Sequence, residues 1–185
     1  SDLIYVRNGI GELRKASVKK AVKSDDLALL DLERPFNSEY SLDIPNNYKL
    51  RIGQKAYVMG FPLADFLGEN MPSITEGIIS KDVGMLNYPG NFQLTSKLNS
   101  GNSGGPIFSD QGDVIGVAVG KIDKAYLLEN EGLIPEDVNF AIKLKLVNYL
   151  TDIGIEIDKN KSILNAEELY YNKLPSVVMI INVVN

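Results

Sequence analysis

The sequence contains no histidine, no cysteine and no tryptophan in its 185 residues. Without cysteine the chain has no disulfide framework, no cysteine-ligated zinc and no thiol nucleophile. Without histidine it has no imidazole to bind a metal ion or to act as a general base near neutral pH. We therefore expect a domain held together by an ordinary hydrophobic core, with neither a metal nor an organic cofactor.

Basic side chains are also scarce relative to acidic ones. The chain has 19 lysines and arginines against 24 aspartates and glutamates, which gives a net charge of −5. Because no excess positive charge is present to attract a polyanion, we expect no nucleic-acid partner. The longest apolar run, Pro175 to Val184, is interrupted by Asn182 and reaches about half of the roughly 20 residues that a membrane-spanning helix needs. We expect no membrane span in this chain.

The sequence does contain a series of short apolar runs rich in Val, Ile, Leu and Tyr, bounded by Gly, Pro, Asn or Asp. This spacing favours an all-β sandwich or barrel over alternating strands and helices. The first run is already under way at Leu3, so we expect the chain to start within a domain. The predicted strands are Leu3 to Val6, Leu13 to Val22, Leu27 to Leu32, Lys55 to Met59, Ile74 to Lys81, Phe92 to Lys97, Pro106 to Ser109, Val114 to Lys121 and Val138 to Ile142.

Two helices and a final strand complete the predicted organisation. Apolar residues near helical spacing predict a helix from Leu144 to Ile153. Asn165, followed by two glutamates, predicts a capped helix that ends at Tyr171. A β-branched run from Leu174 to Ile181 predicts a buried strand. The expected regions are the remainder of an N-terminal β-barrel with a polar linker (1–45), a C-terminal β-barrel with its helix (46–158), and a tail helix and strand (159–185).

The strongest chemical signal is the run Gly101-Asn102-Ser103-Gly104-Gly105-Pro106, in which three glycines surround one serine. An acyl-transfer site places its serine on a tight turn, so that the backbone N–H groups at Gly101 and Ser103 can point at a developing oxyanion. A Cβ at residue 101 would restrict that orientation. The alternative is an ordinary polar turn between two strands, which has a similar composition. The six residues alone do not separate these interpretations.

A second signal is Asp26, which opens the apolar strand Asp26-Leu27-Ala28-Leu29-Leu30. A carboxylate at this position fits either an interface between two barrels or an ordinary turn before a strand. For an aspartate considered alone, the turn is the more common role.

These stretches occur together with others in the order of a known family. Met59-Gly60-Phe61-Pro62 is similar to its Gly-x-Pro loop, and Ile74 to Ser80 resembles its Thr-x-Gly-Ile-Val-Ser strand. Val117 to Gly120 and Val138 to Ile142 match the strands that flank its specificity pocket. With the Asp26 strand and the Ser103 turn, the chain resembles the trypsin-like serine endopeptidases of the HtrA/Deg type over residues 1–153. The joint occurrence is far more specific than any one feature.

The resemblance implies two perpendicular antiparallel six-stranded β-barrels with a site between them, of which the N-terminal barrel is incomplete here. It implies that the chain acts on peptide bonds of protein or peptide substrates in an extracytoplasmic location, and oligomers are compatible with it. Ser103 is the nucleophile by this resemblance, Asp26 the orienting carboxylate, and Gly101 with Ser103 the oxyanion hole. The residues implied near the substrate's primary side chain are Leu98, Ser100, Val119 and Lys121.

A general base is missing from this set, because the resemblance places the histidine on a segment just upstream of Ser1. Asp26 cannot replace an imidazole, since its role is to orient and stabilise the imidazolium. Three explanations remain open. The chain is a piece of an active enzyme; it is a pseudo-protease that keeps a peptide-binding groove; or a lysine, with Lys97 the nearest in sequence, serves as the base.

The tail carries a further resemblance, because Leu174 to Ile180 is similar to the Pro-Ser-Val-Val-x-Ile opening strand of the same peptidase domains. We expect this strand to pair with an open edge of the incomplete barrel, since an uncovered edge promotes association. The alternative is a strand that only packs behind the C-terminal helix.

Overall fold

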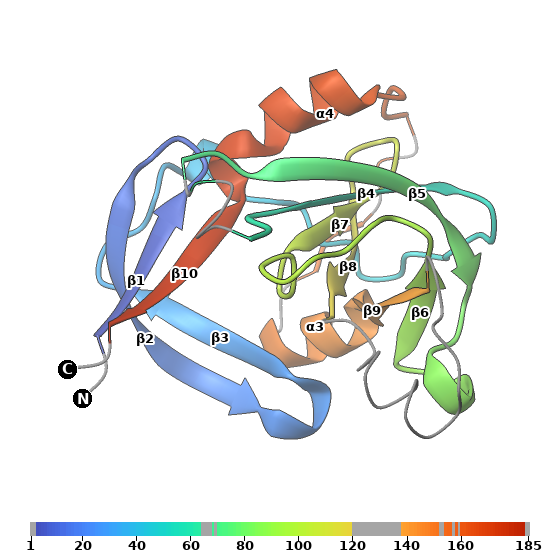
Figure 1. Ribbon diagram of the computed structural model, residues 1–185, viewed down its shortest axis with the longest axis horizontal. Helices are drawn as coiled ribbons and strands as arrows, with labels where there is room; N and C mark the ends of the chain where they lie inside the picture. Colours follow the sequence, from blue (N-terminus) through green and yellow to red (C-terminus); the bar gives the residue numbers. More distant parts are fainter. Residues whose placement is uncertain are drawn as a thin grey trace.

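A computed structural model shows two β units side by side (Figure 1) and describes residues 3–63, 68, 70–119, 138–151, 154–156, 158 and 160–183. One unit is a closed barrel with the strand order β4-β5-β6-β9-β8-β7, and the other is a four-stranded sheet with the order β10-β1-β2-β3. The barrel strands are β4 (Lys55–Gly60), β5 (Ser73–Lys81), β6 (Asn91–Leu94), β7 (Pro106–Phe108), β8 (Val114–Ala118) and β9 (Asn139–Lys143). The sheet strands are β1 (Leu3–Asn8), β2 (Leu13–Val22), β3 (Leu27–Leu32) and β10 (Val178–Val183).

The mostly β architecture confirms the predicted fold class, with a closed C-terminal barrel and an N-terminal unit that stays open. Helices are few among the described residues: α3 (Leu144–Thr151), α4 (Ala166–Lys173) and short 3₁₀ turns at Lys23–Asp25, Ser38–Tyr40, Met85–Asn87 and Leu174–Ser176. No described helix has both the length and the apolar content needed to cross a membrane.

The barrel is filled by side chains that alternate along its strands. Val58, Ile79, Phe92 and Ile107 are fully or almost fully buried in one core cluster. A second cluster lies on the other face of β4 and contains Tyr57, since successive side chains of a strand point to opposite faces. Both faces of β4 are therefore covered from Ala56 to Gly60, and the apolar sequence of that stretch follows from its position.

Some predicted strands end earlier than expected. β6 ends at Leu94 instead of Lys97, and side-chain hydrogen bonds attach Ser96, which lies beyond it, to neighbouring strands. The Ser96 hydroxyl donates to the Ala56 carbonyl at 3.1 Å, and the Asn139 amide donates to the Ser96 carbonyl at 2.9 Å. β8 ends at Ala118, before its predicted end at Lys121, and Lys121 itself lies outside the described residues.

The tail strand β10 completes the four-stranded sheet. It pairs antiparallel with β1 from Leu3 opposite Val183 to Asn8 opposite Val178, without a register shift. The predicted pairing of the tail with an open sheet edge is therefore confirmed. As a result, the first and last described residues lie at the same corner, where the two chain ends are marked in Figure 1. The strand begins later than predicted because Pro175 lies in the 3₁₀ turn that precedes it.

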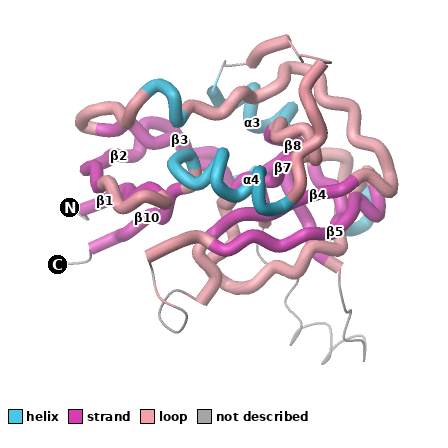
Figure 2. Tube along the Cα trace, turned by 90° about the horizontal axis from the view of Figure 1, so that it is seen from above, coloured by secondary structure: helices cyan, strands magenta, loops and turns pink. Residues whose placement is uncertain are grey.

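The helix α4 connects the barrel to the tail strand and lies across the top of both units (Figures 1 and 2). Its predicted cap is present: the Asn165 side chain accepts from the Glu168 N–H at 3.0 Å, and Glu168 accepts from the Asn165 N–H at 2.9 Å. Leu169 and Val177 are buried in the second barrel cluster. The tail therefore covers the outer face of the barrel before it joins the sheet.

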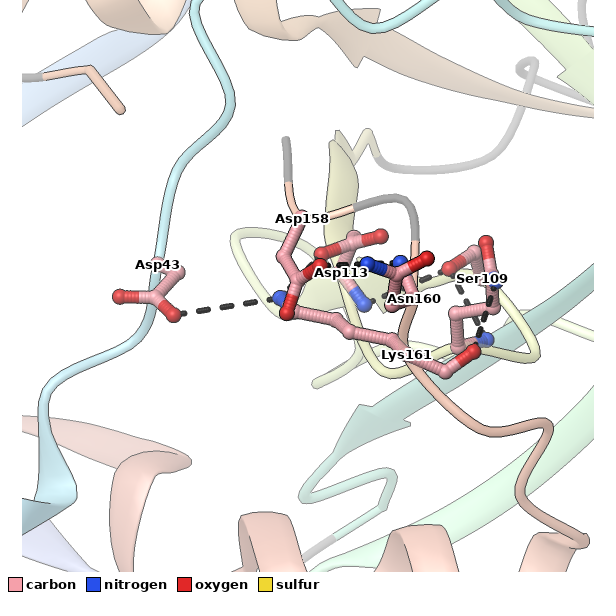
Figure 3. A network of polar contacts seen from close by, with 7 residues as sticks. Asp43, Ser109, Asp113, Asp158, Asn160 and Lys161 are labelled. Carbon is pink, nitrogen blue, oxygen red and sulfur yellow. Dashed lines mark hydrogen bonds and ion pairs between the residues drawn. The ribbon is translucent and has the colours of Figure 1, made fainter. Parts of the chain in front are cut away.

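A buried ion pair fastens the segment before α4 to the barrel (Figure 3). Lys161 Nζ lies 2.6 Å from Asp113 Oδ1 and 3.9 Å from Asp43. Asp113 is only 1% exposed, and its second carboxylate oxygen has no hydrogen-bond partner within the described structure. Burial lowers the pKa of the neighbouring Lys173, and the charge of Lys161 lowers it further. The cluster thus joins the tail, the turn after β7 and the linker.

Deleting residues 172–185 is expected to lower the melting temperature and to increase association, because β1 then presents an unpaired edge. Circular dichroism melting and size-exclusion chromatography measure the two effects. Removing only residues 184 and 185, which follow β10, is the control and is expected to change neither. A melting temperature unaffected by the long deletion would contradict a stabilising role for β10.

Replacing Lys161 is expected to destabilise the fold, because Asp113 would remain buried without its cation. The change Lys161→Met should lower the free energy of unfolding by about 3 kcal/mol in urea titrations. Adding Asp113→Leu should restore part of the loss, because no buried charge then remains. Lys19→Met is the matched control, since Lys19 pairs with Asp31 on the surface, and it should cost less than about 1 kcal/mol.

Candidate functional site

The run around Ser103 forms a turn that only glycine permits at its key position. Gly101 has φ +96° and Gly104 has φ +83°, both in the region that favours glycine. A Cβ on Gly101 would overlap the carbonyl oxygen of Phe61, whereas a Cβ on Gly104 would meet nothing within 4 Å. The turn is therefore packed against the residues that follow β4 at Gly101, and it is open at Gly104.

Hydrogen bonds hold the backbone of this turn in place. The Asn102 N–H donates to Asn99 at 3.0 Å, the Gly104 N–H to Ala118 at 2.8 Å, and the Gly105 N–H to Asn102 at 3.0 Å. Across the turn, the Leu63 N–H donates to the Ser100 carbonyl at 2.8 Å. The turn is thus attached both to β8 and to the loop after β4.

Two backbone N–H groups of the turn have no hydrogen-bond acceptor among the described residues. Neither the Gly101 N–H nor the Ser103 N–H donates a hydrogen bond to any part of the chain that the structure describes. Both residues are exposed, and the Ser103 hydroxyl likewise has no partner among those residues. An exposed hydroxyl with two uncommitted N–H groups in its own turn can attack a carbonyl and stabilise an oxyanion, provided that a base removes its proton.

The turn forms one wall of a large cleft of about 950 Å³ between the barrel and the four-stranded sheet. The opposite wall is formed by residues of all four sheet strands, including the tail, and all of them except Asn182 are apolar. On the barrel side the lining residues are Gly60, Phe61, Leu63, Ser100, Gly101, Ser103, Gly104 and Gly105, and on the sheet side Ile4, Val18, Ala28, Leu30, Val178, Met179, Ile180 and Asn182.

Asp26 lies on a second, smaller pocket, of about 220 Å³, that Ser103 also lines. It follows the 3₁₀ turn at Lys23–Asp25 in a left-handed conformation with φ 53° and is exposed. The structure therefore places Asp26 in a turn before β3 and still brings it to the same pocket as Ser103. The other walls of this pocket include β8 and α3.

The four residues implied for substrate binding do not all meet. Ser100 lines the large cleft, and Val119 lines the pocket that contains Asp26. Leu98 is 4% exposed within the core cluster of the barrel and lines neither space. Lys121 lies outside the described residues. Lys97 is exposed and makes no hydrogen bond to Ser103. Within the described ranges, no three His, Cys, Asp or Glu side chains come together as a metal site.

Several wall residues had no signal in the sequence. Val178 and Ile180 were predicted as parts of a strand, but the face they present depends on the register with β1. Val147 and Leu150 of α3 line the Asp26 pocket, although their helical spacing indicated only packing on the barrel. Phe61 belongs to the stretch that resembles the family's Gly-x-Pro loop, which was the one available clue, and Leu63 follows that stretch.

The family described as trypsin-like peptidase domain matches residues 2–117, which include the Asp26 strand and the Ser103 turn. The chain belongs to this family. The peptidase domain is 29% identical over 191 residues to "Serine protease HtrA-like" of Staphylococcus aureus, with 89% of this chain and 23% of the relative covered. It is 28% identical over 165 residues to "Periplasmic serine endoprotease DegP" of Salmonella typhimurium, with 87% of this chain and 32% of that protein covered.

A protein designated y4bJ from Sinorhizobium fredii is 32% identical to the peptidase domain over 163 residues, which cover 86% of this chain and 25% of y4bJ. The solved serine endoprotease from Yersinia pestis aligns with a TM-score of 0.63 and 25% identity, covering 81% of this chain and 47% of that one. The peptidase domain thus spans a quarter to a third of the curated relatives and about half of the solved chain.

Gly101 and Gly104 are expected to differ in how much an added side chain destabilises the fold, because only Gly101 is packed closely against other residues. Gly101→Ala should lower the free energy of unfolding by more than about 2 kcal/mol, because strain at positive φ adds to the overlap with Phe61. Gly104→Ala adds only the strain, about 1 kcal/mol. Urea unfolding of both variants measures the difference, and equal losses would mean that the turn does not press against Phe61.

Proposed function

We propose that this domain is a serine endopeptidase that cleaves peptide bonds through an acyl-enzyme at Ser103. The single observation that carries the proposal is the exposed hydroxyl on the cleft wall, in a turn whose Gly101 and Ser103 amides are uncommitted. Asp26 is the orienting carboxylate, and the two amides form the oxyanion hole. The general base is a histidine outside these 185 residues, which we expect upstream of Ser1.

In this mechanism the base removes the hydroxyl proton as Ser103 Oγ attacks the substrate carbonyl. The negative charge that develops on the carbonyl oxygen is stabilised by the Gly101 and Ser103 N–H groups. Asp26 holds the imidazole in the correct tautomer and stabilises its protonated form. The base then returns the proton to the leaving amine, and water hydrolyses the acyl-enzyme.

The shape of the cleft supports an extended polypeptide as substrate. Its sheet wall is apolar except for Asn182, and its lining residues come from both β units, with Leu63 on the barrel side and Ile180 on the tail strand. We propose that unfolded or extended protein segments bind here, with Leu98, Ser100, Val119 and Lys121 near the side chain that precedes the cleaved bond. Because the DegP relative is named as periplasmic, we propose an extracytoplasmic location for this domain as well.

A second candidate function is a pseudo-protease that binds peptides in the same cleft without cleaving them. This candidate needs no general base, and the 185 residues contain no histidine. The two functions differ in one property, the nucleophilicity of Ser103, because both need the cleft and its apolar wall.

A fluorophosphonate probe tests the proposal on the polypeptide that carries the segment upstream of Ser1. We expect covalent labelling of Ser103, located by mass spectrometry and abolished in Ser103→Ala. The 185-residue chain alone should react more slowly by a factor on the order of 10⁶, because it lacks the base. A well-folded longer polypeptide that binds an unfolded peptide but is not labelled would favour the pseudo-protease.

A further inference from the structure

The helix α4 and the serine turn both pack against the end of β4. The side chains of Met59 and Phe61 are buried in the second barrel cluster together with Leu169 of α4. The serine turn packs against the backbone carbonyl groups of the same two residues, because a Cβ on Gly105 would overlap the first and a Cβ on Gly101 the second. One short stretch of backbone therefore lies between the tail helix and the proposed oxyanion hole.

A hydrogen bond from α4 holds the neighbouring strand at the same place. The Tyr170 hydroxyl donates to the Pro72 carbonyl at 2.8 Å. Pro72 is buried and immediately precedes β5, whose first residue, Ser73, is paired with Gly60 at the end of β4. The bond therefore attaches the tail to the end of the β4–β5 ladder, against which the serine turn packs.

We infer that Tyr170 is a positioning residue of the proposed peptidase, which holds the end of this ladder so that the Gly101 and Ser103 amides keep the geometry of an oxyanion hole. The inference rests on the proposed function and adds to it a role for the tail helix. Tyr170 acts through the backbone of β4 and β5, since it is not among the described residues that line the cleft or the pocket of Asp26.

The Tyr170 hydroxyl is suited to this role because it stays protonated. Burial raises the pKa of the phenol, and the neighbouring Tyr171 raises it further. The hydroxyl therefore donates to the Pro72 carbonyl over the whole neutral pH range. A phenylalanine at this position would take the donor away from a buried backbone acceptor, and such a change favours a shifted backbone that recovers a partner.

The helix itself is a firm support for this bond. Leu169, the residue before Tyr170, is completely buried, and the ring of Tyr171 packs edge-on against the Tyr170 ring with 5.3 Å between the centroids. The segment that leads into α4 is attached to the barrel by the ion pair of Lys161 and Asp113. The position of the hydroxyl is therefore set by contacts on several sides.

Small displacements of the serine turn matter because an oxyanion hole acts through its geometry. Its donors lie about 2.7–3.1 Å from the oxyanion, and the loss of one donor costs on the order of 10²–10³ in kcat. A misplacement of about 1 Å can cost on the order of 10² in rate. The turn already packs closely against the Phe61 carbonyl, so a shift of that carbonyl either moves the turn or opens a gap beside Gly101.

The change Tyr170→Phe tests this role, in the polypeptide that carries the segment upstream of Ser1, because it removes only the hydroxyl. With a fluorogenic peptide of extended sequence as substrate, we expect kcat to fall about 10-fold or more. The rate of fluorophosphonate labelling at Ser103 should fall by a similar factor. KM should stay within about twofold of the parent value, because the lining of the cleft is unchanged.

Tyr171→Phe is the matched control. It removes the same group from the next residue, whose exposed hydroxyl forms no hydrogen bond with the described part of the chain. We expect kcat, KM and the labelling rate to equal those of the parent polypeptide. Circular dichroism melting of both variants shows that each is folded at the temperature of the assay.

A peptide aldehyde separates an effect on the oxyanion hole from an effect elsewhere in the site. Its adduct with Ser103 places an oxygen in the oxyanion hole, as the transition state does. Tyr170→Phe should raise the inhibition constant of the aldehyde by about the factor by which kcat falls. The affinity of the corresponding peptide amide, which forms no adduct, should stay the same.

Four results would overturn the inference while labelling of the parent at Ser103 upholds the proposed function. They are an unchanged kcat in Tyr170→Phe, an equal loss in both tyrosine variants, a raised KM with unchanged kcat, and a lowered kcat with unchanged inhibition by the aldehyde. The third would assign the effect to the cleft wall, and the fourth to a group other than the two amides. If Ser103 of the parent polypeptide is not labelled, the proposed function fails and the inference fails with it.

Discussion

The close approach between the serine turn and the end of β4 is the constraint on which the site depends. A Cβ on Gly101 would overlap the Phe61 carbonyl, and a Cβ on Gly105 would overlap the Met59 carbonyl. Because both positions are glycine, the turn can pack against this backbone and bond to β8 on its other side. With its neighbours committed in this way, the turn leaves the Gly101 and Ser103 amides without a hydrogen bond to the described residues, and both residues line the cleft.

The second wall of the cleft depends on contacts between distant parts of the chain. β10 comes from the tail, yet it lies beside β1 and contributes Val178 and Ile180 to the space in front of Ser103. Its position is maintained by burial of Val177 and Leu169 against the barrel and by the Lys161–Asp113 ion pair. The stability of the tail and the shape of the candidate site are therefore linked.

The N-terminal unit is an open sheet, and residues on one of its faces line the cleft beside the serine turn. The sheet has outer edges at β3 and β10, and its apolar face turns toward the serine turn without the cover of further strands among the residues described. The carboxylate and the hydroxyl of the proposed mechanism are already placed on one pocket. The proposed mechanism also needs an imidazole, and the 185 residues contain no histidine.

The sequence by itself determined the strands, caps and turns, because these depend on residues that are close together in the chain. The spacing of apolar runs predicted most strands within a few residues, Asn165 with the glutamates after it predicted the cap of α4, and the glycines around Ser103 predicted a tight turn. Each of these depends on backbone conformation or side chains only a few positions apart.

Only the tertiary structure decided which surfaces those elements share. Burial of Leu98 in the barrel core, exposure of Asp26 on the pocket of Ser103 and pairing of Lys161 with Asp113 all join residues from separate elements. The tail resembled an opening strand in its sequence, but its partner was set by the free edge of β1, since ladder hydrogen bonds are made by any backbone and carry little sequence specificity. Local pattern thus determined the elements, and packing between them determined the site.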